Sequence, residues 1–232
     1  MTFIVAIQLN DSIVIAADNK HIIINEIGES RIDTEKTQKI YSWNKGIIVG
    51  TGESYVITRS VELFKKTNPS RLDKLPQCLE ISRQLREFEI GTDYYQVENT
   101  KLLCSCYSES GIQLYTVQRF NPSQPYELTT INAMSITVWL FHPNVETISV
   151  DLQNLYSDLK DYSTFSNQIA WINYYIRHLA PIYRKQSQQD PLMSQSFDYF
   201  FQAKDEYITG HISNTSNTIP EIKEISSNYE SI

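Results

Sequence analysis

The spacing of apolar residues along this chain alternates between two periods, and the order of the changes limits the folds that it can adopt. Runs rich in β-branched residues predict strands at 3–9, 12–17, 39–43 and 46–49, with weaker strand patterns at 22–24 and 27–32. Helical spacing then covers 53–66 and 72–90. Further strands are predicted at 101–107, 112–120, 126–131 and 136–141, helices at 150–159 and 167–183, and final strands at 197–202 and 207–212.

This order of strands, two helices, strands, two helices and strands indicates the α+β class, because alternating α/β folds do not segregate their elements in this way. Each helix pair can cover the outer face of one sheet, so we expect a four-layer αββα sandwich. A length of 232 residues, 41% of them apolar, suffices for one domain with a sizeable core. We assign that domain to residues 1–212 and interpret the polar residues 213–232 as a mobile C-terminal tail.

Charge and composition argue against several classes of protein. The net charge is -7 and the basic residues are scattered, whereas binding to a phosphate backbone needs clustered Lys and Arg. No apolar run approaches the roughly 20 residues that span a bilayer, and the N-terminus lacks the basic region of a secretory signal. We therefore expect no nucleic acid or membrane partner and a cytoplasmic location.

Three cysteines are too few for a disulfide framework. Cys104 and Cys106 alternate within a strand pattern, so their side chains would share one face. No second pair of ligands accompanies them, and a structural metal site needs about four. The sequence therefore implies neither a metal nor an organic cofactor.

Thr2 carries the first chemical hypothesis. Its small side chain permits removal of Met1, and the chain would then begin with a residue that bears both a hydroxyl and a free α-amine. An α-amine has a pKa of about 8, so it can accept the hydroxyl proton at neutral pH. A threonine at position two is common by itself, and it gains meaning only from its surroundings.

Those surroundings form an ordered set of short motifs. Thr2 opens a strand, a second strand ends in Ala-Ala-Asp at Asp18, Lys39-Ile40 follows, and Gly-Thr-Gly at 50–52 leads directly into a helix. Over residues 2–66 the chain resembles the proteasome β subunits, the bacterial HslV peptidase and, equally well, the smaller bacterial Anbu group. The resemblance is architectural in the remainder of the chain.

The resemblance assigns roles to four residues of this segment. Thr2 matches the nucleophile, Asp18 the aspartate that holds the active-site lysine, and Gly52 the glycine whose N–H contributes to the oxyanion hole. Lys39 matches that lysine best; the segment after Asp18 is longer than in the β subunits, so Lys36 is an alternative. A cationic lysine beside the α-amine would lower the pKa of the amine and keep it a free base.

The second half of the chain departs further from the family pattern. Ser135 stands where the family has a Ser in a Gly-Ser-Gly turn, but Ala133 and Met134 precede it. Asp190 and Ser194 follow the last predicted helix and match a family Asp/Ser pair, although the spacing differs and the following glycines are missing. The chain has only seven glycines, which favours an alternative in which activity has been lost.

The resemblance implies a self-assembling, threonine-type peptidase that hydrolyses amide bonds in peptides or proteins through an acyl-enzyme on Thr2. It implies homo-oligomers built as rings or spirals, and the absence of an ATPase motif means that any unfoldase would be a separate protein. Two alternatives remain: an inactive proteasome-like scaffold, which would keep Met1, and an amidohydrolase that acts on small amides.

Overall fold

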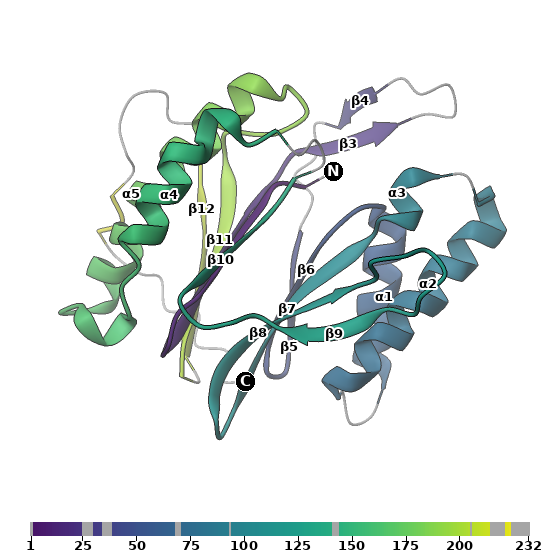
Figure 1. The fold of residues 1–232 in the computed structure, drawn as a ribbon, viewed down its shortest axis with the longest axis horizontal. Coiled ribbons are helices and arrows are strands. Elements are labelled where there is room, and N and C mark those ends of the chain that lie inside the picture. Colours follow the sequence, from purple (N-terminus) through teal and green to yellow (C-terminus); the bar gives the residue numbers. More distant parts are fainter. Residues whose placement is uncertain are drawn as a thin grey trace. The chain divides into compact units, whose positions relative to one another are not determined.

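The computed structural model describes residues 2–24, 30–33, 39–67, 71–92, 94–140, 144–204, 206–213 and 221–223. The chain divides into two compact units (Figure 1). We call Ile40–Ile131 the central unit, and Thr2–Lys39 together with Asn132–Ser231 the terminal unit.

The central unit is a five-stranded antiparallel sheet with helices packed against one face. The strand order is β5-β6-β7-β8-β9, and Trp43 and Phe64 pack edge to face in the core between sheet and helices. Its elements are β5 (Ile40–Trp43), β6 (Gly46–Thr51), α1 (Ser54–Lys66), η1 (Leu72–Lys74), α2 (Leu75–Ile90), α3 (Tyr95–Glu98), β7 (Lys101–Ser108), β8 (Gly111–Gln118) and β9 (Glu127–Thr130).

The terminal unit repeats this plan with a second five-stranded sheet, in the order β10-β1-β2-β11-β12, and a separate β3-β4 hairpin. Helices α4 and α5 pack against one face of the sheet (Figure 1). Its elements are β1 (Ile4–Gln8), β2 (Ser12–Asp18), β3 (His21–Ile24), β4 (Ser30–Asp33), β10 (Ser135–Trp139), η2 (Glu146–Ile148), α4 (Ser149–Ser157), η3 (Tyr162–Thr164), α5 (Gln168–Gln189), β11 (Phe197–Ala203) and β12 (Glu206–Ile212).

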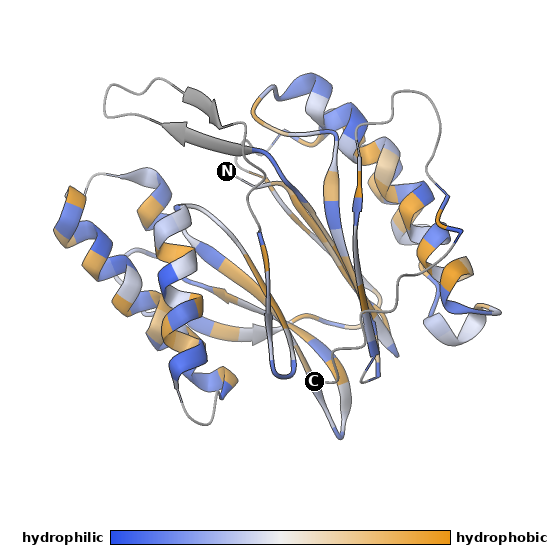
Figure 2. Ribbon diagram, turned by 180° about the vertical axis from the view of Figure 1, so that it is seen from behind, coloured by the Kyte–Doolittle hydropathy of each residue, from blue (hydrophilic) through white to orange (hydrophobic). Residues whose placement is uncertain are grey.

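Strands β1 and β2 form the centre of the terminal sheet because their side chains are apolar on both faces. Phe3, Val5 and Ile7 belong to the core beneath the helices, and the alternate residues Ile4 and Ala6 are also fully buried. A two-residue turn joins the strands, closed by a hydrogen bond from the N–H of Leu9 to the carbonyl of Ser12 at 2.9 Å. Figure 2 shows the resulting apolar strands beside helices that carry both apolar and polar residues.

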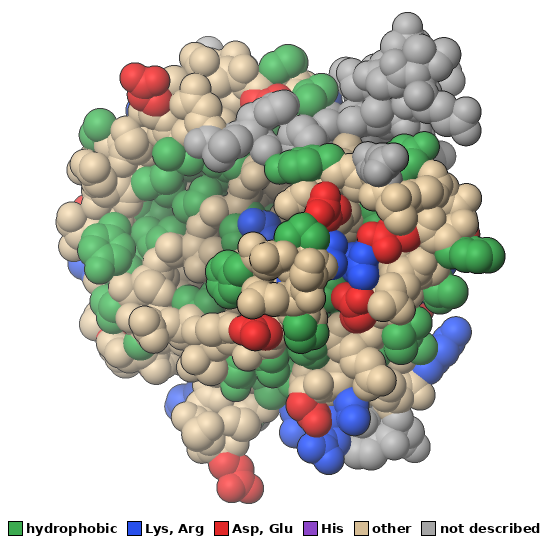
Figure 3. Space-filling view, turned by 45° about the vertical axis from the view of Figure 1, so that its right-hand side comes forward, with side chains coloured by type: hydrophobic (Ala, Val, Ile, Leu, Met, Phe, Trp, Pro, Cys, Tyr) green, Lys and Arg blue, Asp and Glu red, His purple; other side chains and the backbone are tan. Residues whose placement is uncertain are grey.

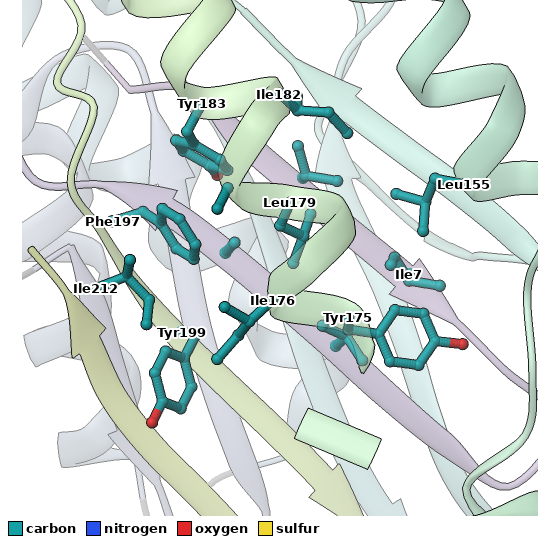
Figure 4. Packing of buried hydrophobic residues seen from close by; sticks show 14 of the residues in the cluster. Ile7, Leu155, Tyr175, Ile176, Leu179, Ile182, Tyr183, Phe197, Tyr199 and Ile212 are labelled. Atoms are coloured by element: carbon teal, nitrogen blue, oxygen red, sulfur yellow. The ribbon is translucent and has the colours of Figure 1, made fainter. Parts of the chain in front are cut away.

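Aromatic residues of α5 fill the core of the terminal unit (Figure 4). Trp171, Tyr175 and Tyr183 are at most 1% exposed. The ring of Tyr183 lies between Phe3 and Phe197, with centroids 4.5 and 4.4 Å away. Burying each large side chain contributes about 1.5–3 kcal/mol, so this row of contacts fixes α5 over the start of β1.

The α+β class and the order of the elements predicted from the sequence are confirmed. Each unit supplies one sheet and one helical layer of the predicted sandwich. Helix α5 runs to Gln189 rather than ending at 183, because its buried face continues through Gln186 and outweighs the backbone hydrogen bond lost at Pro181. Helix α3 was not expected, since four residues are too few to show a period.

The division into residues 1–212 and a tail stays a prediction. One described part of the tail is held against α5, where Asn173 exchanges two hydrogen bonds with the backbone of Ile222, at 2.8 and 2.9 Å. Within the described residues, every helix is too short or too polar to cross a membrane.

Candidate active site

Asp18 lies at the end of β2 and joins three parts of the terminal unit. Its Oδ1 accepts a hydrogen bond from the backbone N–H of Phe3 at 2.7 Å and contacts Lys39 Nζ at 2.9 Å. Its Oδ2 accepts from the N–H of Lys20 at 3.2 Å. A carboxylate with this many donors is fixed in position, so Asp18 connects the lysine directly to the first peptide group of β1.

Lys39 and Asp18 form a buried ion pair. The lysine side chain is 8% exposed and that of the aspartate 1%. Burial lowers the pKa of Lys39, and attraction to Asp18 and, less strongly, to Asp198 opposes the shift. A buried lysine whose charge depends on a neighbouring carboxylate is typical of functional sites. Lys36, the alternative, lies outside the described residues.

Thr2 precedes β1 and is 6% exposed. The residue that follows it, Phe3, donates its N–H to Asp18 and accepts the N–H of Asp18 at its own carbonyl, at 3.0 Å. The hydroxyl of Tyr183 is 3.4 Å from the same carbonyl. The residue before β1 is thereby held by Asp18 at the end of β2 and by Tyr183 of α5.

A small polar network connects the segment after α5 to the end of β2. Ser194 and Ser196 both donate to Oδ1 of Asn19, at 2.9 and 2.6 Å. The N–H of Asn19 is 3.3 Å from the Ser194 hydroxyl. Because Asn19 follows Asp18 directly, the structure places Ser194 beside the Asp18–Lys39 pair, as the sequence resemblance suggests for the role of that serine.

His211 and Asp198 extend this network across the β11-β12 hairpin, where the strand register pairs them. His211 Nδ1 is 2.8 Å from Asp198 Oδ1 and 3.2 Å from Asn19 Nδ2. The same ring nitrogen thus faces a carboxylate and an amide N–H, so its contacts depend on whether it carries a proton. Asp198 is also close enough to Lys39 to raise the pKa of the lysine.

Asp190 caps the end of α5. Its Oδ1 accepts from the N–H of Leu192 at 2.9 Å, and its carbonyl accepts from the N–H of Met193 at 3.0 Å. Its Oδ2 is buried without a hydrogen-bond partner among the residues that the structure describes. The carboxylate shapes the turn that leads to Ser194, and whether it also acts on substrate stays a prediction.

Ser135 is not brought to this group of residues. It pairs with Gln8 at the far end of β1, where its hydroxyl donates to the carbonyl of Asn132. Gln8 is six residue steps of extended strand from Thr2, a distance of about 20 Å. Strand β10 starts at Ser135 and runs from there toward the Thr2 end of β1. The structure therefore does not bring Ser135 to this group, and its part in catalysis stays a prediction.

Gly52 belongs to the central unit, where it connects β6 to α1. Its φ of +116° is in the region that favours glycine, and a Cβ there would lie 2.5 Å from Cα of Thr100. The next residue, Glu53, caps α1 by accepting the N–H of Val56 at 2.8 Å. Glycine is required here for backbone conformation and close approach; its part in an oxyanion hole stays a prediction.

We expect Gly52→Ala to lower the free energy of unfolding by about 2–3 kcal/mol, since it combines the strain of a positive φ with a clash against Thr100. Gly91→Ala is the matched control: Gly91 has a φ of +97°, but nothing lies within 4 Å of its added Cβ. Urea denaturation of both variants separates the two causes. Equal losses in the two variants would mean that contact with Thr100 contributes nothing.

The network residues Asn19, Ser196, Asp198 and His211, with Tyr183 behind them, were not assigned to the site from the sequence. His211 looked like one of four dispersed histidines. The sequence could have indicated the role of His211 through the β11-β12 hairpin. The register of the two predicted strands places Asp198 opposite His211.

The two sheets, their helical layers and the buried Lys–Asp pair at the start of the first strand define a proteasome-like fold.

No protein-family model and no curated protein sequence matches the chain. Similar solved structures are Anbu proteins. A helical assembly of the Anbu complex from Pseudomonas aeruginosa has a TM-score of 0.64 and 11% identity over 93% of this chain and 88% of that chain. A Gly-1 mutant of Anbu from Hyphomicrobium sp. strain MC1 has a TM-score of 0.61 and 12% identity over 92% and 88%. The chain thus has the fold of Anbu, as the resemblance in its first segment predicted.

Proposed function

We propose that this chain is a threonine-type N-terminal nucleophile hydrolase that cleaves amide bonds in peptides, with Thr2 as nucleophile after removal of Met1. The observation that carries the proposal is the contact of one oxygen of Asp18 with both the N–H of Phe3 and Nζ of Lys39. This shared oxygen supports a role for the buried Lys39 at Thr2, because Thr2 precedes Phe3 directly.

In the proposed reaction the Thr2 hydroxyl attacks the carbonyl carbon of the scissile amide while its proton passes to a base. The base is the free α-amine of Thr2, and the Lys39 ammonium lowers the pKa of that amine. The proton then moves to the leaving amine as the C–N bond breaks, which leaves an ester on Thr2. Water attacks this ester with the same base, releases the acid and restores the hydroxyl.

The same proposal includes self-assembly, supported by the fold that the chain shares with an Anbu protein solved as a helical assembly. Rings or spirals of identical subunits would place many copies of Thr2 together. A separate ATPase, if one delivers substrates, would be a further protein.

Intact-mass measurement and covalent labelling together test the proposal. We expect the purified chain to lack the mass of Met1 and to gain one equivalent of an electrophile that reacts with both the hydroxyl and the amine of an N-terminal threonine. A fluorogenic peptide panel and a panel of small acyl amides then separate peptidase from amidohydrolase activity. A retained methionine with no labelling would establish the scaffold alternative instead.

A further inference from the structure

A pocket of about 480 Å³ opens in the central unit, near the C-terminal half of α2. This volume is typical of sites that hold small molecules. Figure 3 shows acidic and basic side chains lying close together on one face of the molecule. The pocket is lined by Arg83, Glu87, Thr92, Tyr95, Glu98, Arg119 and Pro122.

Two of the charged residues that line the pocket, Arg83 and Glu87, form an ion pair with each other. Arg83 binds Glu80 through Nε and Nη2, at 3.3 and 2.6 Å, and makes a short contact with Glu87 through Nη1. Its guanidinium group is therefore neutralised by carboxylates of its own helix. Arg83 and Glu87 form a rigid wall of the pocket with no charge left to offer a ligand.

The other two charged residues of the lining, Arg119 and Glu98, form no such ion pair among the residues that the structure describes. Arg119 donates to the carbonyls of Pro122 and Glu98, at 2.8 and 3.2 Å, and these bonds leave some of its N–H groups available. Throughout the described ranges no carboxylate pairs with Arg119, and no donor contacts the Glu98 carboxylate. Within that part of the chain, one positive and one negative group therefore line the same pocket without a direct ion pair, although the charge of Arg119 helps to lower the pKa of the nearby Glu80.

Tyr126 does not line the pocket, but its ring lies beneath the side chain of Arg119, which does. Tyr126 is 5% exposed, and its hydroxyl has no hydrogen-bond partner in the part of the chain that the structure describes. The Arg119 guanidinium lies over its ring, 5.4 Å from the centroid. Burial raises the pKa of Tyr126 to about 12, so the group stays protonated and can donate a hydrogen bond at neutral pH. The buried ring therefore supports the Arg119 guanidinium from beneath, through a cation–π contact.

We propose that this pocket binds a small zwitterion, a free α-amino acid or a very short peptide, whose carboxylate sits on Arg119 and whose ammonium group faces Glu98. A guanidinium group binds a carboxylate through two parallel hydrogen bonds, which orients the ligand. Tyr95, exposed at 62%, offers an aromatic wall for its side chain. The inference does not depend on activity at Thr2.

A plain anion fits the pocket less well. Two carboxylates, Glu87 and Glu98, line it beside two guanidinium groups, so the lining carries no net positive charge. Phosphate or acetate would meet the attraction of Arg119 and the repulsion of Glu98 together. A ligand with both charges satisfies both residues.

Isothermal titration calorimetry on the full chain tests the proposal with L-leucine, the dipeptide Leu-Gly, acetate, isobutylamine and inorganic phosphate. We expect at least one of the two zwitterions to bind about tenfold more tightly than any singly charged probe, and the comparison of the two tells a free amino acid from a peptide. Absence of zwitterion binding, or equal binding of acetate or phosphate, would overturn the proposal.

Two substitutions in the lining, each compared with a control, locate the site. Arg119→Gln and Glu98→Gln should each weaken zwitterion binding about tenfold or more, whereas Arg71→Gln, which changes an exposed arginine paired with Asp73, should not. If Arg119→Gln fails to fold, Arg119→Lys takes its place. It keeps the charge but loses the two parallel hydrogen bonds, so it should also bind the zwitterion less tightly. Parental affinity in folded variants of Arg119 and Glu98 would refute the assignment.

Discussion

Replacement of Thr2 by Ala should abolish peptide hydrolysis, a loss on the order of a millionfold that brings the rate to background. Alanine also permits removal of Met1, so the α-amine, Lys39 and Asp18 remain and only the hydroxyl and the γ-methyl group are lost. The acyl-enzyme ester then cannot form. Initial rates with a fluorogenic peptide, measured on protein whose N-terminus has been verified by mass, report the result.

Thr2→Ser is the matched control, since it keeps a hydroxyl and an N-terminal amine. It should retain measurable turnover and react with the electrophile directed at the N-terminal residue, whereas Thr2→Ala should do neither. Undiminished turnover in Thr2→Ala would show that the nucleophile lies elsewhere and would refute the proposed function.

Substitution of either partner of the Asp18–Lys39 pair should remove activity and also destabilise the fold. Each of Asp18→Asn and Lys39→Met leaves one charge buried without its counter-charge, which costs about 3–5 kcal/mol. Asp18→Asn further weakens the contact with the N–H of Phe3, at 2.7 Å, and so loosens the start of β1. Urea unfolding of the two variants measures both losses.

The double variant Asp18→Asn, Lys39→Met distinguishes a coupled pair from two independent residues. Removing both charges eliminates the uncompensated one, so the double variant should lose less stability than the two single losses added together. Its peptidase activity should stay at background, because Lys39 is absent. Simple additivity would mean that the 2.9 Å contact contributes no coupling energy.

The pH dependence of stability follows from the pKa of Lys39, which burial lowers below 10.5 in the folded protein. Between the two values the unfolded chain binds more protons at this residue than the folded protein does. The free energy of unfolding contributed by Lys39 therefore rises with pH across that window. Lys39→Met should lack this rise. Urea titrations of the parent and the variant at several pH values across that window give the difference in their free energies of unfolding.

The local pattern of apolar and polar residues was sufficient to predict most of the secondary structure and its order. The strand–helix order, the α1 cap at Glu53 and the turn between β1 and β2 all follow from residues close together in the chain. The end of α5 did not, because a proline normally stops a helix and only the buried face around Gln186 carries this one further. The sequence also showed no sign that Ser135 pairs with Gln8 and not with the start of β1, because strand register depends on residues far apart in the chain.

The sequence by itself determined the α+β class and the three residues that we place at the centre of the site, Thr2, Asp18 and Lys39, because apolar periodicity and motif order are local properties. The tertiary structure decided what surrounds them. It joined Asn19, Ser194, Asp198 and His211 into one network, since hydrogen bonds between strands depend on register and not on distance along the chain. It also showed that Arg119 and Glu98 line the same pocket. The residues between them in the chain do not predict that these two charges lie close together.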